Sequence, residues 1–210
     1  MPKTQRTRPT REESRLQTRS RLLEAARRSI ITTGIASATI RGVSEEAGFS
    51  LGAFYSNFRS KHDMLVAIME EQFDELSDSF SQAMEAMQGL NLDASLTALA
   101  TWLEGLHRER ATSRLILELH MHANHDETFG RSYSERRRVY VSKFAKGLKR
   151  LYTLNSPPPS MPADQMASGF IALWNGFSVQ HEGSRPTQVR EIYLAFLRSL
   201  FNARPAAPAH

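Results

Sequence analysis

The sequence predicts an all-α fold, and three observations lead to that prediction. Apolar residues recur three and four positions apart through most of the 210 residues, as on one face of an α-helix. No segment alternates apolar and polar residues over a useful length, so nothing favours a β-sheet. Glycines and prolines stand where the helical patterns stop. A chain of this length can form a small head and a larger body.

The first part of the chain predicts a basic arm followed by a helix. Residues 1–10 contain two prolines and three basic residues, which favours a mobile arm. From Arg11, apolar residues at helical spacing predict a helix that ends near Gly34, with Leu16, Leu23, Ala26 and Ile30 on its inner face. We expect a head at 11–60 and a body at 61–210.

The segment TIRGVSEEAGFSLGAFYSNFRSK (39–61) predicts two short helices joined by a tight turn. The first runs from Thr39 or Ile40 to Ala47, where Gly48 breaks it. Ser50 can cap the second, at 51–57. This arrangement is typical of a helix-turn-helix, whose second helix enters the major groove of DNA.

The body predicts six further helices. A long helix follows Ser60 and runs from Lys61 to about Gln88. We expect the others at about 93–109, 112–124, 127–153, 163–181 and 187–203. The segment NSPPPSMP (155–162) is the one clear linker, because four prolines in eight residues do not continue a helix.

The charge is concentrated in the head. Residues 1–61 hold 12 Lys and Arg against 5 Asp and Glu, whereas the whole chain has a net charge of only +5. A basic head on a slightly acidic body indicates that the head meets a polyanion. The chain has no cysteine, which excludes disulfides and cysteine-bound zinc. Without a signal peptide or membrane span, we expect a soluble, cytoplasmic protein with no membrane partner.

The second short helix has the residues that a groove-binding helix needs. Phe54 and Phe58 are four residues apart and can hold it against the core. Gly52 and Ala53 project little, so the backbone can approach DNA closely. The side chains that can reach phosphates or base edges are Ser50, Tyr55, Asn57, Lys61 and Arg41. The alternative is a helix–turn–helix segment that serves only to pack an all-α core. The exposed Tyr, the following Lys and the basic residues before the segment favour DNA binding.

Residues 15–66 resemble the signature of TetR-type transcriptional regulators. The positions that carry the resemblance are Thr39, Arg41, Val43, Ala47, Gly48, Ser50, Gly52, Tyr55, Phe58, Lys61 and Leu65. The resemblance implies a three-helix DNA-binding domain and a larger helical domain for ligand binding and dimerisation. It also implies a homodimer on a double-stranded DNA operator and a small-molecule effector. We expect no cofactor and no enzymatic activity.

The same resemblance implies roles for single residues. Thr39, Tyr55 and Lys61 would contact phosphates. Arg41, Leu51 and Ala53 would lie next to bases. Two positions depart from the family pattern: Asn57 stands where a His is usual, and Gly42 replaces a residue with a side chain.

The N-terminal arm has two interpretations. Arg6, Arg8 and Arg11 could lie in the adjacent minor groove, or they could add only diffuse attraction for phosphate. The second interpretation is simpler, and the two remain open.

The resemblance implies a ligand pocket in the body, and several apolar side chains fall on faces that could converge there. For each of them, plain core is the simpler interpretation. The candidates are Trp102, Leu106, Ile116, Leu119, His120, Phe144, Leu148, Phe170 and Trp174.

The last two helices have more aromatic and aliphatic residues than one small body needs. In the TetR family such helices pair as a four-helix bundle between two chains. The candidate interface residues are Phe177, Val189, Tyr193, Phe196 and Leu200.

A metal site and an enzyme are weaker alternatives. His120, His122 and His125 have poor spacing for a metal site, because 120 and 122 do not share a helix face, and we expect no metal. No motif of a nucleophile, a phosphate-binding loop or a zinc hydrolase is present, so no catalytic residue is expected. The remaining alternatives are a constitutive DNA-binding protein without a ligand and a protein that packages nucleic acid. We expect a homodimeric repressor that a ligand releases from a palindromic operator.

Overall fold

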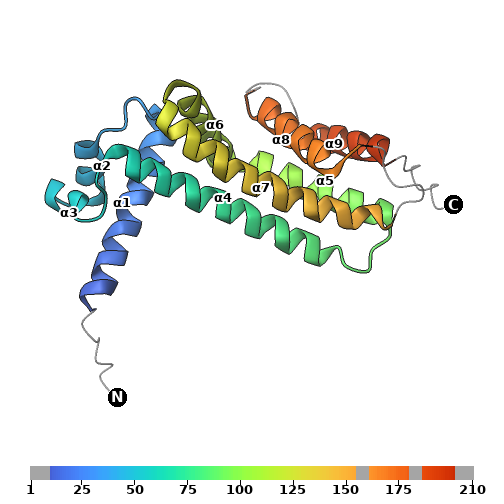
Figure 1. Ribbon diagram of the computed structural model, residues 1–210, viewed down its shortest axis with the longest axis horizontal. Helices are drawn as coiled ribbons and strands as arrows, with labels where there is room; N and C mark the ends of the chain where they lie inside the picture. Colours follow the sequence, from blue (N-terminus) through green and yellow to red (C-terminus); the bar gives the residue numbers. More distant parts are fainter. Residues whose placement is uncertain (1–9, 155–160, 180–185, 202–210) are drawn as a thin grey trace, which may run out of the picture. The chain divides into compact units, whose positions relative to one another are not determined.

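The computed structural model describes residues 10–154, 161–179 and 186–201, and within them the all-α prediction is confirmed (Figure 1). The helices of these residues are α1 to α9 in chain order, and none of the described residues forms a β-strand. The predicted arm, except Thr10, and most of the proline-rich segment lie outside the described residues.

The chain divides into two compact units, Met1–Ile68 and Met69–His210. The division falls inside α4 (Lys61–Ala86), eight residues beyond the end of the head expected from the sequence. Met64, Leu65 and Ile68, on the first two turns of α4, therefore belong to the compact first unit, and all three are buried.

The first unit contains α1 (Arg11–Thr33), α2 (Ile40–Ala47) and α3 (Leu51–Tyr55). Thr10 starts α1 with a capping box, in which its hydroxyl accepts from Glu13 N–H and the Glu13 carboxylate accepts from Thr10 N–H. Gly34 ends α1 at a φ of 83°, as its position predicts. Leu16 is the exception to the predicted inner face: it is 55% exposed, because the first turns of α1 extend beyond the packed core.

The core of this unit is built from α1, α2, α3 and the start of α4. Phe54 and Phe58 are fully buried with ring centroids 5.4 Å apart, which confirms the prediction that they hold α3 in place. The other buried apolar side chains of the unit include Leu22, Leu23, Ile30, Val43, Met64 and Leu65.

The second unit contains the remainder of α4 and five more helices. They are α5 (Leu92–Arg108), α6 (Arg110–His125), α7 (Glu127–Tyr152), α8 (Ala163–Val179) and α9 (Pro186–Leu200). Each lies within a few residues of its predicted position. In this unit α5 packs along α9, and α7 packs against both α6 and α8.

An aromatic cluster joins α4, α5 and α7, which run close together in Figure 1. Phe80 of α4 lies with its ring centroid 4.3 Å from that of Phe144 and 5.2 Å from that of Trp102. Gly147 of α7 faces Phe80 closely enough that a Cβ would clash with the ring. The absence of a side chain at Gly147 therefore permits this close approach of the two helices.

Ion pairs also tie helices of the second unit together. Arg136 of α7 pairs with Asp74 of α4. Arg198 of α9 donates to Asp93 of α5 from two nitrogens, at 2.8 and 2.9 Å, and is partly shielded from solvent. The two nitrogens of Arg198 restrict the orientation of the Asp93 carboxylate and so help to hold α9 against α5.

Among the residues that the structure describes, no helix combines the length and the apolar character needed to cross a membrane.

Candidate nucleic-acid interface and internal cavity

The turn between α2 and α3 is held by backbone and side-chain caps. Thr39 Oγ1 accepts from Gly42 N–H at 3.0 Å, and Ser50 Oγ accepts from Ala53 N–H at 3.2 Å. Gly48 adopts a left-handed conformation, with a φ of 76°, and closes the end of α2. The segment therefore folds as the two capped helices and tight turn that the sequence predicts.

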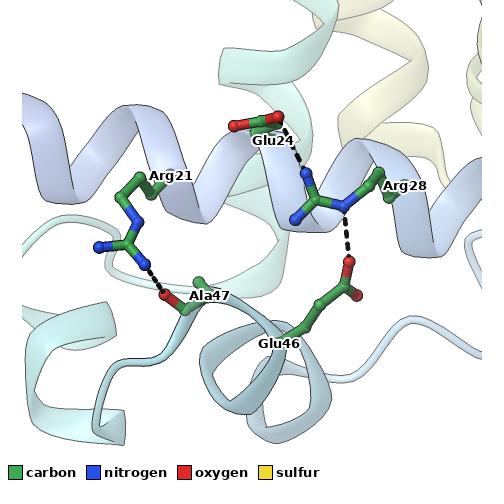
Figure 2. Close-up of polar contacts among 5 residues, drawn as sticks. All are labelled: Arg21, Glu24, Arg28, Glu46 and Ala47. Atoms are coloured by element: carbon green, nitrogen blue, oxygen red, sulfur yellow. Dashed lines mark hydrogen bonds and ion pairs between the residues drawn. The ribbon is translucent and has the colours of Figure 1, made fainter.

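Three arginines of α1 support this turn, and Figure 2 shows two of them, Arg21 and Arg28. Arg21 donates to the carbonyl oxygen of Ala47 at 3.1 Å, and its guanidinium lies over the Phe49 ring. Arg28 pairs with Glu24 at 2.9 Å and Glu46 at 2.8 Å. The hydrogen bond to Glu46 raises the pKa of Arg28 above its ordinary value. Arg21 thus satisfies a carbonyl at the end of α2 that lacks a partner within the helix.

The third arginine supports α3. Arg19 donates to the carbonyl oxygen of Asn57 at 3.2 Å, and its guanidinium lies 4.4 Å from the centre of the Phe58 ring. The charge count of the head does not separate these supporting arginines from those free to meet DNA. The spacing of Arg21 and Arg28 could have indicated part of this role, because residues seven positions apart share a helix face.

The predicted DNA-binding side chains lie on α2, on α3 and in the turns beside them. Exposed residues are Thr39, Arg41, Ser50, Leu51, Gly52 and Tyr55. Tyr55 is 56% exposed, and its ring packs edge-on against buried Phe54. Although the hydroxyls of Thr39 and Ser50 accept the capping bonds, each still has an O–H that can donate to a phosphate.

Ala53, Asn57 and Lys61 are only partly exposed. The Asn57 side chain donates from Nδ2 to the carbonyl oxygen of Ala53 at 2.8 Å, so it closes the end of α3. Lys61 Nζ donates to the carbonyl oxygen of Ile35 at 2.5 Å, and burial lowers the pKa of Lys61. An ammonium group has three donors, so this bond leaves Lys61 able to bind a phosphate as well.

A narrow cavity lies inside the second unit. Six of the nine predicted pocket residues line it: Trp102, Leu106, Ile116, Phe144, Phe170 and Trp174. The other lining residues, which the sequence interpretation missed, are Phe73, Leu76, Leu103, Tyr133, Arg137, Tyr140, Ile171 and Asn175. Helical periodicity predicts which residues face inward, but it does not tell which inner faces meet around a space.

Three predicted pocket residues do not line this cavity. Leu119 and Leu148 are buried elsewhere in the core, at 1% and 0% exposure. His120 lies beside Tyr133, with ring centroids 5.7 Å apart. Leu119 and Leu148 are the plain core residues that the alternative interpretation describes.

The predicted dimer residues divide into two groups. Val189 and Tyr193 are completely buried within the single chain, and Tyr193 packs on Phe177, with ring centroids 5.4 Å apart. These two residues were wrongly assigned to an interface, because their side chains already fill the core between α8, α9 and their neighbours. Phe196 is 52% exposed, and Phe177 and Leu200 are partly exposed, so these three remain accessible to a partner.

In the part of the chain that the structure describes, no three His, Cys, Asp or Glu side chains come together as a metal site would require. His122 lies against Phe129, with ring centroids 5.0 Å apart, whereas His120 lies against Tyr133. Aromatic packing thus accounts for two of the three histidines in the sequence cluster.

The capped α2–turn–α3 unit, supported from α1, defines a helix-turn-helix protein. Residues 22–68 match the family model described as "Bacterial regulatory proteins, tetR family". This match confirms, for the head of the chain, the resemblance that residues 15–66 predict.

Curated relatives agree with this assignment. The regulator ArpR of Pseudomonas putida, described as a probable HTH-type transcriptional regulator, is 32% identical over 84 residues, which are 40% of this chain and 39% of ArpR. The chain therefore matches about two fifths of the length of that relative. The HTH-type transcriptional regulator BetI of Vibrio atlanticus is 24% identical over 84% of this chain and 88% of its own length.

The fold extends this similarity to the whole chain. The structure of GusR from Salmonella enterica superposes with a TM-score of 0.74. At 17% identity, the superposition covers 95% of this chain and 100% of GusR. The helical body after the helix-turn-helix therefore has the same fold as that protein.

Proposed function

We propose that the protein is a DNA-binding transcriptional regulator, and that it acts in the cytoplasm as a homodimeric repressor on a palindromic operator. The observation that carries this proposal is the exposed face of α2 and α3, presented by a capped turn in a segment that matches the tetR family model. A single head of this size contacts too little DNA for useful specificity, which favours two copies on two half-sites.

The proposed contacts follow from exposure and chemistry. Thr39, Tyr55 and Lys61 bind phosphates, and Ser50 and Asn57 border the same backbone. Arg41, Leu51 and Ala53 lie next to base edges, where a guanidinium can read guanine and an apolar side chain can touch the thymine methyl group. Gly52 leaves room for the backbone of α3 to approach the groove, since it has no side chain.

A small-molecule effector releases the DNA in this proposal. The cavity of the second unit supports it, because an apolar pocket with a few polar groups is the usual form of a ligand site. The α4 helix runs without a break from Lys61 to Ala86, so a tilt of α4 on ligand binding would change the spacing of the two recognition helices. Half-sites require a spacing of about 34–36 Å or its multiples, and a ligand that prefers another spacing weakens binding.

The test is selection of bound fragments from genomic DNA by the full-length protein, followed by footprinting. We expect one palindromic site to be protected, in two half-sites one or two helical turns apart. Uniform protection without sequence preference would instead favour a protein that packages DNA. Protection that no compound in a broad library alters would favour a constitutive DNA-binding protein.

A further inference from the structure

We propose that the cavity of the second unit binds a planar aromatic carboxylate, whose negative charge is met by Arg137. This inference rests on the proposed function, because it gives the chemical class of the effector.

The walls are largely aromatic. Phe73 lies 5.5 Å from both Tyr133 and Tyr140, centroid to centroid, and Trp102 lies 5.9 Å from Phe144. Rings at these separations form a surface on which another flat ring can stack or lie edge-on. The walls therefore favour a planar aromatic ligand.

The polar groups of the cavity are mostly hydrogen-bond donors. Trp174 is only 6% exposed, and its buried Nε1–H has no hydrogen-bond partner in the described part of the chain. The indole N–H of Trp102, by contrast, already donates to Ser79 Oγ at 2.9 Å. Because an indole N–H and a guanidinium donate but do not accept, the ligand must supply acceptors.

Arg137 gives the cavity a positive charge. No carboxylate lines the cavity, and Arg137 forms no ion pair with any residue that the structure describes. The preceding residue, Arg136, pairs with Asp74. A guanidinium beside aromatic walls binds a carboxylate through two parallel hydrogen bonds, so an anionic ligand balances the charge.

The two tyrosines stay neutral and remain available as donors. Burial raises the pKa of Tyr133 to about 12, although the nearby Arg137 opposes the shift. Burial also raises the pKa of Tyr140. Both phenols therefore keep their protons at neutral pH and add no negative charge that would repel a carboxylate.

The cavity has a volume of only about 30 Å³. This is far below the roughly 300–1,000 Å³ of typical ligand pockets, so the aromatic side chains must shift to admit even one ring. A compact, flat molecule needs the smallest shift of these side chains, which again favours a small aromatic acid over a bulky, non-planar ligand.

The test compares aromatic acids with their own primary amides: benzoate, cinnamate and 2-naphthoate against the matching amides. Titration calorimetry gives the affinities for the full-length protein. Tryptophan fluorescence reports where binding occurs, because the two tryptophans of the chain both line the cavity. We expect at least one acid to bind about ten-fold or more tightly than its amide, the usual effect of a charged hydrogen bond.

Variants assign the preference to one side chain. Arg137→Gln should weaken binding of the acid by about ten-fold and leave the amide unchanged, whereas Arg137→Lys keeps the charge and should restore part of the preference. Arg138→Gln is the matched control, because it removes the same charge from the next residue, which is exposed and does not line the cavity. Thermal melting checks that each variant is folded.

The inference is overturned if no acid binds at millimolar concentration, if acid and amide bind equally, or if the Arg137 and Arg138 variants behave alike. Footprinting in the absence of any aromatic acid or amide tests the proposed function independently of ligand binding. If the protein protects an operator but binds acids no better than amides, the inference about the ligand is wrong and the proposed function stands. A protein that prefers acids but protects no DNA disproves the proposed function, and the cavity then binds acids for another purpose.

Discussion

At the scale of single residues, two glycines of the helix-turn-helix have different tasks. Gly48 has a φ of 76°, a conformation that a residue with a side chain adopts at a cost of about 1–2 kcal/mol. Gly52 is helical and exposed, and a Cβ there would meet only Ser50 Oγ at an ordinary 3.6 Å. Gly48 thus stabilises the fold, whereas the lack of a side chain at Gly52 matters only where DNA comes close.

We predict opposite effects when each of these glycines is replaced by alanine. Gly48→Ala should lower the free energy of unfolding by about 1–2 kcal/mol, because the left-handed conformation becomes strained. Gly52→Ala should leave stability equal or slightly higher, since alanine favours a helix. It should nevertheless weaken operator binding, because the new methyl group stands between α3 and the groove. Thermal melts and gel shifts measure the two effects, and unchanged operator affinity for Gly52→Ala would contradict the proposed approach.

Two arginines of the head form a second matched pair. Arg21 donates to Ala47 and lies over Phe49, whereas Arg41 is exposed on α2. We predict that Arg21→Ala lowers the free energy of unfolding by about 1 kcal/mol, the contribution of one such hydrogen bond. Arg41→Ala should leave the melting temperature unchanged and weaken operator binding by about ten-fold. Equal melting temperatures for the two variants would show that Arg21 does not support the turn.

At the scale of elements, the contact between α4 and α7 depends on Gly147. A Cβ at this position would clash with the ring of Phe80, which is itself packed against Phe144. Gly105, in α5, has no atom near the place of its missing Cβ. Both glycines are helical, but a side chain at Gly147 would meet Phe80 whereas a side chain at Gly105 would meet open space.

We predict that Gly147→Ala destabilises the protein by about 1–3 kcal/mol, the usual effect of overpacking a core. Gly105→Ala should stabilise it by about 0.5–1 kcal/mol, because alanine is the better helix former and nothing obstructs it. Denaturant unfolding of the two variants should show midpoints shifted in opposite directions. A stabilised Gly147→Ala variant would mean that α4 and α7 are less closely packed than the structure indicates.

At the scale of the whole molecule, the proposed homodimer depends on side chains that the single chain leaves exposed. Phe196 on α9 is 52% exposed, whereas Tyr193, one turn earlier, is completely buried. Of the predicted interface residues Phe196 is the most exposed, so it is the best candidate among them for a contact with a second copy.

We predict that Phe196→Asp produces monomers at micromolar concentration, because a buried carboxylate without a partner disfavours the interface. The helix content should not change, since Phe196 is not part of the core of the single chain. Tyr193→Phe is the control: it keeps the buried ring and should leave the dimer intact. Sedimentation measures both, and a wild-type chain that is monomeric without DNA would contradict the proposed interface.

The helices and the helix-turn-helix could be predicted from the sequence. Local chemistry specifies them: caps such as Ser50, breaks such as Gly48, and apolar spacing all act within a few residues. The family signature at residues 15–66 is also local, and the match at residues 22–68 confirms it.

Which helix faces meet could not be predicted from the sequence and became visible in the folded chain. The tertiary structure separated Tyr193, buried in the core, from Phe196, exposed one turn later, and it brought Arg137 to an aromatic cavity. It also assigned Arg21 to the turn between α2 and α3, where a charge count suggests only attraction for DNA. The physical reason is that periodicity gives the inward side of a helix, whereas burial, cavities and ion pairs depend on packing between residues far apart in the chain.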